Sequence, residues 1–319
     1  MQIPWIPILI VVASVGAAVA MLAWRERNRR VVLRRVLARR PVGADGVIPG
    51  AHSISIPGGV ARGALVLHGF GDTPQSVRGL CDALARAGFG VEAPLLPGHG
   101  RTLMAFDRAT EQQWLIEARA AWLALRSRYG TCVLAGQSMG GALALILAAE
   151  DPPAALVVCA PFVASTSGFD RAVRWSWLWA LWQPYVETAD PRSLRDPEAL
   201  VQSRAYGAAT HRSLRSLARL KRQAVAALGR VRAPTLMVLS PEDNRVPAAA
   251  AEAAFGALGS ADKSLQWRPG EGHVLLADRG REAVAAAAVD WFTRWAGGGK
   301  NRGQMAAGTS PSGPVRLTS

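Results

Sequence analysis

Short runs of apolar, strand-forming residues alternate with longer stretches of mixed apolar and polar residues through most of the chain. The runs predict strands at residues 53–56, 64–67, 90–93, 131–135, 155–159, 235–239 and 264–267. The longer stretches predict helices at 75–87, 112–128, 140–149 and 282–295. Repeated strand-then-helix order with apolar strands is typical of an α/β fold: a mostly parallel sheet with helices on both faces.

Two segments of the chain depart from this alternation. Residues 160–233 contain no clear strand and are rich in Trp, Arg and Ala, so we expect a helical cap inserted into a main domain that spans 46–296. From residue 297 the chain turns to Gly, Ser, Pro and Thr, and this composition predicts a disordered tail over 297–319.

The first 24 residues carry no charged side chain, and residues 3–23 are almost wholly apolar. As a helix this run would span about 30 Å, the thickness of a bilayer's hydrocarbon core. Trp5 and Trp24 stand near its two ends, where amphipathic rings favour the membrane interface. We therefore expect residues 1–24 to form a transmembrane anchor.

Eight arginines and one glutamate follow within residues 25–40. Arginines are retained on the cytoplasmic side, so we expect the rest of the chain to face the cytoplasm. The linker, 25–45, is either a helix on the anionic leaflet or a solvated segment. The alternatives for the apolar run are a buried core helix or a signal peptide cleaved after residues 18–20, Ala-Val-Ala, with export. A signal peptide needs a basic region before its apolar run, and only the first residues precede this one.

The net charge of +14 is concentrated at the two ends of the 319-residue chain. Residues 25–40 contribute +7 and the tail +3, so residues 41–296 carry only +4. This distribution argues against a nucleic-acid partner. The three cysteines stand in apolar runs and read as buried thiols rather than disulfide partners.

Residues 136–140, Gly-Gln-Ser-Met-Gly, match the pattern G-x-S-x-G. The motif follows a predicted strand and opens a predicted helix, which is the setting of a nucleophile elbow. We therefore expect Ser138 to stand on a sharp turn at the carboxyl end of the sheet. The alternative is an ordinary glycine-rich turn.

A serine needs a base to become a nucleophile, and the base needs an acid to orient it. His273 follows the last predicted strand, and Asp243 follows the strand at 235–239. The order Ser138, Asp243, His273 is the one that hydrolase sheets of this kind impose. Glu242 is the rival acid because it is the neighbour of Asp243.

An oxyanion site needs two backbone N–H donors. We expect one from Met139, the residue after the nucleophile, and one from Phe70 in the loop after the strand at 64–67. His68 and His99 stand in glycine-rich loops, where a structural hydrogen-bonding role is the stronger interpretation.

Five motifs occur in this order: Leu-His-Gly-Phe-Gly at 67–71, Pro-Gly-His-Gly at 97–100, Gly-Gln-Ser-Met-Gly-Gly at 136–141, Glu-Asp-x-x-Val-Pro at 242–247 and Gly-His-Val at 272–274. The set resembles the α/β-hydrolase superfamily and, within it, the bacterial carboxylesterase and monoacylglycerol lipase group, over about residues 53–296. The resemblance implies Ser138 as nucleophile, Asp243 as acid, His273 as base, and Phe70 and Met139 as oxyanion donors.

Four tryptophans fall within eight residues of the expected cap: Trp175, Trp177, Trp179 and Trp182. In such hydrolases the cap lines the acyl pocket, so these side chains are candidate contacts for an apolar acyl chain or for lipid. Packing of the cap on the core is the equal alternative. The sequence has no metal-ligand motif and no nucleotide-binding loop, and we expect no metal and no cofactor.

Together these features predict a membrane-anchored serine hydrolase that cleaves a small-molecule or lipid carboxylic ester. Two alternatives stay open. One is a thioesterase or perhydrolase with the same triad; the other is a non-catalytic binding protein of the same fold, although a complete triad argues against it.

Overall fold

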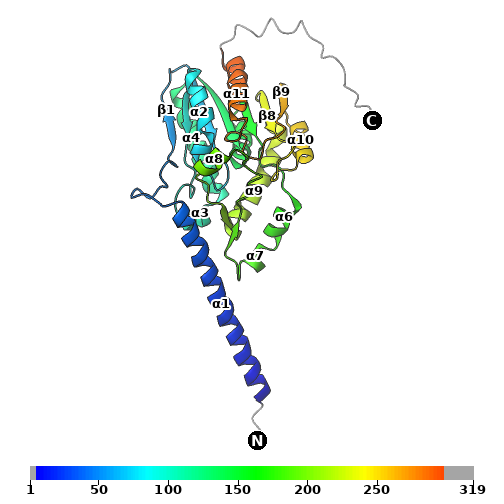
Figure 1. Ribbon diagram of the computed structural model, residues 1–319. Coiled ribbons are helices and arrows are strands. Elements are labelled where there is room, and N and C mark those ends of the chain that lie inside the picture. The colour runs from blue at the N-terminus through cyan, green and yellow to red at the C-terminus, as the bar shows by residue number, and fades with distance from the viewer. Residues whose placement is uncertain (1–4, 298–319) are drawn as a thin grey trace.

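The computed structural model describes residues 5–297, and a seven-stranded sheet forms its centre (Figure 1). The strand order is β1 (Ile54–Ile56), β3 (Gly90–Ala93), β2 (Arg62–Leu67), β4 (Thr131–Gln137), β5 (Leu156–Cys159), β8 (Thr235–Leu239) and β9 (Lys263–Trp267). All neighbours are parallel except β1 and β3. The α/β class and the mostly parallel sheet are confirmed, and each expected strand lies within two residues of its predicted bounds.

Helices cover both faces of this sheet. On one face lie the 3-10 turn η1 (Pro74–Val77), α2 (Arg78–Arg86) and α11 (Arg281–Ala296), whose buried residues Leu84 and Phe292 pack over the strands. On the other lie α4 (Glu111–Arg128), α5 (Met139–Glu150), α9 (His211–Ala227) and α10 (Ala248–Gly256). The short α3 (Leu103–Arg108) and η2 (Leu228–Arg230) complete this second layer. Parallel strands buried on both faces explain why their sequences are almost continuously apolar.

The cap occupies the insertion after β5. Its helices are α6 (Ser167–Arg174), α7 (Ser176–Trp179) and α8 (Pro197–Gln202), and α9 continues it into the core. The expectation that 160–233 holds no strand is wrong, because β6 (Tyr185–Glu187) pairs antiparallel with β7 (Ala208–Thr210). Three-residue strands are too short to show a period-two pattern, so the sequence does not reveal them.

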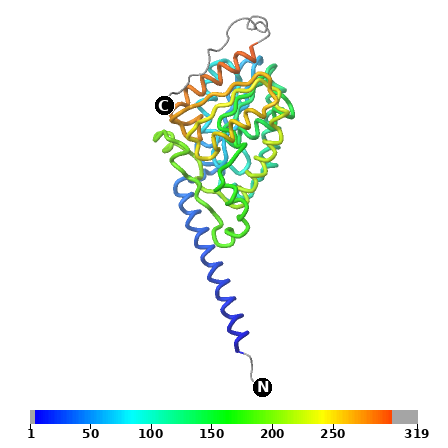
Figure 2. The backbone as a smooth tube through the Cα atoms, turned by 90° about the vertical axis from the view of Figure 1, so that its right-hand side faces the viewer, coloured from blue at the N-terminus to red at the C-terminus, as the bar shows by residue number. Residues whose placement is uncertain are grey.

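Helix α1 (Trp5–Arg39) projects from the body as one continuous helix (Figures 1 and 2). All residues from 5 to 24 are exposed, and mean hydropathy reaches 2.6 in the most apolar window. By length and composition this helix can cross a membrane, and signal sequences share both properties.

The arginine-rich half of α1 lies against the cap. Arg25 Nε donates a hydrogen bond to the carbonyl of Ala180 (3.2 Å), and Val36 is buried in the core. Arg35 also pairs with Glu187 of β6 at 3.4 Å. Residues 25–39 are therefore helical and partly packed on the body. The tail predicted for residues 297–319 lies, apart from Gly297, outside the described residues.

Candidate active site

Ser138 stands between β4 and α5 with φ at 55°, a left-handed conformation that is unusual for a residue other than glycine. The glycines on either side permit this turn. A Cβ at Gly136 would collide with the carbonyl of Gly140, and a Cβ at Gly140 would collide with the carbonyl of Leu67. The sequence G-x-S-x-G thus forms the sharp strand-to-helix turn that presents the serine hydroxyl at the carboxyl edge of the sheet.

The structure brings Ser138, His273 and Asp243 into one hydrogen-bonded row. His273 Nε2 lies 2.7 Å from Ser138 Oγ, and His273 Nδ1 lies 2.7 Å from Asp243 Oδ2. A carboxylate can only accept, so Nδ1–H is the donor and Nε2 is left to accept the serine proton. All three side chains are largely withdrawn from solvent.

Two backbone N–H groups orient the carboxylate of this row. Asp243 Oδ1 accepts from Arg245 N (2.7 Å) and Val246 N (2.9 Å). Burial by itself would raise the pKa of Asp243, but His273 and these two N–H donors outweigh burial and hold that pKa below its ordinary value. Glu242 instead accepts from Ser240 Oγ and Gly270 N, so it fixes the loop and does not contact the imidazole.

Two buried side chains that sequence reasoning missed hold the histidine loop. Gln137 Nε2 donates to the carbonyl of His273 (2.8 Å), and Gln137 Oε1 accepts from Leu276 N (3.2 Å). Asp278, fully buried, accepts from Gly272 N at 2.6 Å and from Asp196 N at 2.8 Å. Neither role has a local sequence signal except that Gln137 lies inside the elbow motif.

Phe70 and Met139 belong to the two backbone segments next to Ser138: the loop after β2 and the start of α5. Met139 is the first residue of α5, so its N–H has no acceptor within the helix. The Phe70 N–H also has no hydrogen-bond acceptor within residues 5–297. A Cβ at Gly69 would lie only 3.6 Å from that of Ser138, which places this loop beside the serine. Two free donors therefore flank the hydroxyl.

The sequence model of a family described as "Serine aminopeptidase, S33" matches residues 61–280. The chain belongs to this family of α/β hydrolases. A thermostable monoacylglycerol lipase from Bacillus sp. (strain H-257) is 31% identical over 242 residues, covering 74% of this chain and 92% of the relative. A carboxylesterase from Bacillus subtilis is 23% identical and is covered over 89% of its length.

Solved structures agree with this assignment. The lipolytic enzymes LipS and LipT, derived from a metagenome, are the subject of one structure with a TM-score of 0.70 and 27% identity, covering 78% of this chain and 99% of that one. The monoacylglycerol lipase of Paleococcus ferrophilus matches with a TM-score of 0.64 and 22% identity, over 76% of this chain and 98% of its own, and shows the same fold. These comparisons confirm the prediction that the α/β hydrolase is an ester hydrolase.

The two other histidines in the motifs, His68 and His99, are buried and packed within the fold. His68 is fully buried between the carbonyl of Gly69 and the N–H of Leu96, and burial lowers its pKa to about 4. His99 packs edge-on against Phe106 with ring centroids 4.9 Å apart, and burial lowers its pKa as well. Both rings are neutral near pH 7 and contact the loop that holds Gly69 and Phe70, or its neighbours, rather than Ser138.

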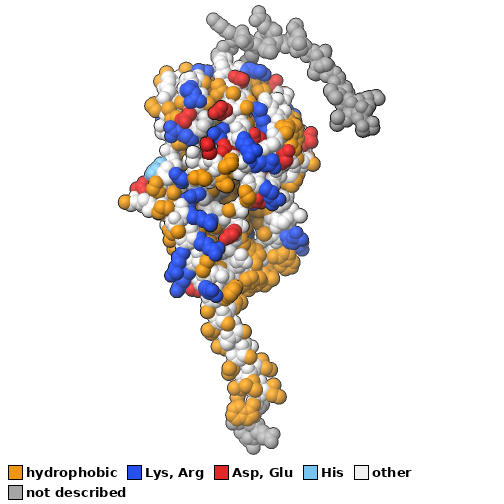
Figure 3. Space-filling model, viewed as in Figure 1, with side chains coloured by type: hydrophobic (Ala, Val, Ile, Leu, Met, Phe, Trp, Pro, Cys, Tyr) orange, Lys and Arg blue, Asp and Glu red, His pale blue; other side chains and the backbone are white. Residues whose placement is uncertain are grey.

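The four cap tryptophans do not share one environment. Trp175, Trp177 and Trp182 are exposed. Helix α7, which lies among them in the chain, stands at the lower end of the body (Figure 1), and hydrophobic side chains gather at that end beside α1 (Figure 3). Trp179 is half-buried, and its Nε1 donates to the carbonyl of Ala172 (2.8 Å). The exposed indoles thus form an apolar tip on the cap, residues 175–182, next to the membrane-length helix.

Proposed function

We propose that the protein is a serine hydrolase of the carboxylesterase or monoacylglycerol lipase type. It would act through an acyl-enzyme formed on Ser138, with His273 as the base and Asp243 as the orienting acid. The observation that supports this most is the unbroken row Asp243–His273–Ser138, in which the only free imidazole nitrogen faces the serine hydroxyl.

In this mechanism His273 Nε2 takes the Ser138 proton as Oγ attacks the ester carbonyl. The N–H groups of Phe70 and Met139 stabilise the oxyanion that develops on the carbonyl oxygen. The imidazolium, held by Asp243, then protonates the leaving alcohol. A water molecule then attacks the acyl carbonyl while His273 takes its proton. The bond between Ser138 Oγ and the acyl carbon breaks, the acid leaves, and His273 returns the proton to Oγ.

An ester with a long acyl chain and a small alcohol fits the proposal best. The relative with the higher identity is named as a monoacylglycerol lipase, and the cap of this chain exposes Trp175, Trp177 and Trp182 beside an apolar helix. Such a cap tip would contact the lipid interface and admit amphiphilic substrates from it. The thioesterase and perhydrolase alternatives use the same triad and differ only in the acyl donor or the attacking group.

A fluorophosphonate probe tests the proposed nucleophile directly. It should label the purified chain once, at Ser138, and labelling should disappear in Ser138→Ala. A panel of p-nitrophenyl esters, monoacylglycerols, acyl thioesters and aminoacyl amides then ranks the substrate classes. We expect monoacylglycerols to give the highest kcat/KM. Labelling at another residue would refute the triad, and preferred hydrolysis of aminoacyl amides would refute the ester assignment.

We also propose that residues 1–24 anchor the chain in the cytoplasmic membrane with the hydrolase domain in the cytoplasm. The arginines after residue 24 support this orientation. The chain should stay in the membrane fraction after a salt wash, and protease added to intact spheroplasts should not digest the body. A mature chain that starts near Met21, or a body digested from outside, would support export instead.

A further inference from the structure

Helix α9 carries a row of arginines that has no matching row of acids. Arg212, Arg215, Arg219 and Arg222 are spaced three and four residues apart, so they lie on one face of the helix. Arg219 is neutralised by Glu111, whose two carboxylate oxygens accept from it at 2.6 and 2.9 Å. Within residues 5–297 the side chains of the other three arginines form no ion pair and no hydrogen bond. Like charges at this spacing repel one another, and an anion would remove that cost.

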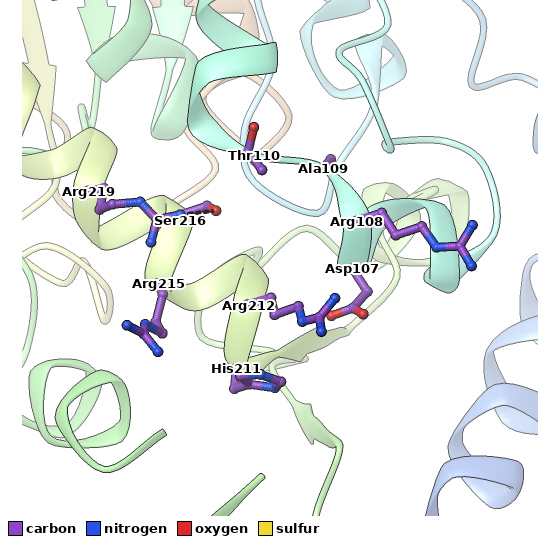
Figure 4. A pocket seen from close by; sticks show the side chains of 9 residues that line it. All are labelled: Asp107, Arg108, Ala109, Thr110, His211, Arg212, Arg215, Ser216 and Arg219. Carbon is purple, nitrogen blue, oxygen red and sulfur yellow. Dashed lines mark hydrogen bonds between the residues drawn. The ribbon is translucent and has the colours of Figure 1, made fainter. Parts of the chain in front are cut away.

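The row borders two adjoining cavities of about 380 and 310 Å³ that share Arg215 and Arg219. Six arginines and a single carboxylate, Asp107, line them. The six are Arg108, Arg174, Arg212, Arg215, Arg219 and Arg222. In Figure 4 the Arg212 side chain extends from α9 toward Asp107, the Arg215 side chain extends from α9 in the opposite direction, and Arg108 points away. Asp107 leaves most of the positive charge unbalanced.

The cap connects both cavities to the base of the apolar span. Arg25, the first charged residue after that span, donates to the cap carbonyl of Ala180. The ring of Trp179, in the cap tip, packs edge-on against His211 at 6.3 Å, and His211 lines the larger cavity. Burial lowers the pKa of His211, and the charges of Arg212, Arg215 and Arg25 lower it further, while Asp107 opposes them.

We propose that this pair of cavities binds the phosphate group of an anionic lipid headgroup. The inference rests on the membrane anchorage proposed above, which sets the cavities at headgroup level. Guanidinium groups bind phosphate oxygens through paired, charge-assisted hydrogen bonds, and Arg212 and Arg215 have these donors free. Trp177 lines the smaller cavity and belongs to the exposed cap tip, which offers an apolar surface to the acyl chains of the same lipid. A free phosphate would use the arginines but not this tip.

The test measures binding to the full chain in a neutral maltoside detergent by calorimetry. The ligands are short-chain phosphatidylglycerol, short-chain phosphatidylcholine and inorganic phosphate. We expect saturable binding of phosphatidylglycerol that weakens about tenfold or more in the double variant Arg212→Gln with Arg215→Gln. The matched control, Arg27→Gln with Arg34→Gln, removes the same charge from exposed positions of α1 outside the cavities and should change affinity less than about twofold.

Each result decides the proposal. Equal losses in the two double variants would reduce the effect to general attraction by positive charge and overturn it. Inorganic phosphate binding as tightly as the lipid would overturn the lipid source, and absence of saturable binding would overturn the site. Arg212→Lys with Arg215→Lys should restore part of the affinity, since it keeps the charge without the planar donors.

Fluorophosphonate labelling of the same samples separates this inference from the proposed catalysis. The cavity arginines do not contact Ser138, so labelling should persist in every variant. If the unsubstituted chain is not labelled, the proposed triad is wrong, whereas lipid binding measured in the same samples would still support the lipid site.

Discussion

The carboxyl edge of the sheet and the cap tip are built in opposite ways. At the sheet edge, Ser138, Asp243 and His273 are largely buried, and each is held by backbone groups or a neighbouring ring. At the cap tip and on the neighbouring helix α9, Trp177 and Arg215 are exposed, and the link to α1 consists of a few side-chain bonds. Transfer of a proton over one hydrogen bond requires fixed atoms, whereas contact with a fluid interface is served by an exposed, adaptable surface.

The largest effect on this comparison should come from Ser138→Ala. Removing the nucleophile should lower kcat by about 10⁶, leaving the residual rate that binding and the oxyanion donors provide. The melting temperature should barely change, because alanine has the same backbone restrictions at this turn. Steady-state kinetics on the best ester measures it, with exposed Ser127→Ala as the control. Near-normal turnover in a folded Ser138→Ala protein would exclude the assignment.

The second effect concerns the two adjacent acids of the β8 loop. Asp243→Asn should lower kcat by about 10⁴, because the amide no longer holds His273 in the tautomer that accepts the serine proton. Glu242→Gln should change kcat by less than about tenfold, since its carboxylate contacts Ser240 and Gly270 instead. Comparing both variants on one substrate measures the difference, and a reversed ranking would move the acid to Glu242.

A third effect is on stability at low pH. The folded state holds the pKa of His68 at about 4, below its ordinary value of 6.5, because the ring is buried. Between these values the unfolded state binds more protons than the folded state. The contribution of His68 to the free energy of unfolding is therefore complete above pH ~6.5, and about 3 kcal/mol of it is lost as the pH falls toward ~4.

Denaturant unfolding of the wild type and of His68→Gln across this range isolates the contribution of His68. Asp72, whose pKa burial raises to about 6, acts in the opposite direction but is common to both proteins. The free energy of unfolding of the variant should therefore fall less on acidification. Parallel curves would contradict the buried neutral imidazole.

A smaller effect should follow from Gln137→Glu. Glutamate has nearly the same side-chain shape as glutamine but lacks the amide NH₂ group that donates to the His273 carbonyl, so the histidine loop should shift slightly. We expect kcat to fall by about 10- to 100-fold with little change in KM, as for small misplacements of a catalytic group. Exposed Gln113→Glu on α4 is the control. A loss confined to KM would show that Gln137 acts on substrate binding instead of positioning.

The smallest effect is a difference in stability between two truncated proteins, one without the apolar span of α1 and one that also lacks its packed half. Deleting residues 1–24 should release the protein from the membrane without loss of stability, because all these described residues from 5 onward are exposed. Deleting residues 1–40 should also leave an active protein, but it should cost about 2 kcal/mol as Val36 leaves the core. Thermal unfolding of both truncated proteins measures the difference, and equal stability would mean that α1 adds nothing to the body.

Local patterns were enough to predict the α/β class, the seven strands of the central sheet and the elbow around Ser138. Burial on both faces makes a parallel strand apolar along its length, and an elbow demands glycine at fixed positions, so both leave a signature in a few adjacent residues. Helix α10 was missed because residues 248–256 are mostly alanine, and a uniform run shows no apolar stripe.

Features that depend on partners far along the chain were decided by the tertiary structure alone. The sequence favoured Asp243 but kept Glu242 as a rival, and which of them meets His273 depends on the path of the β8 loop, since the two are neighbours with the same chemistry. The β6–β7 pair, the bond from Arg25 to Ala180 and the contact of Gln137 with His273 each join residues that local periodicity cannot relate. The sequence determined what each segment is, because that depends on neighbours a few residues away; only folding determined which segments meet.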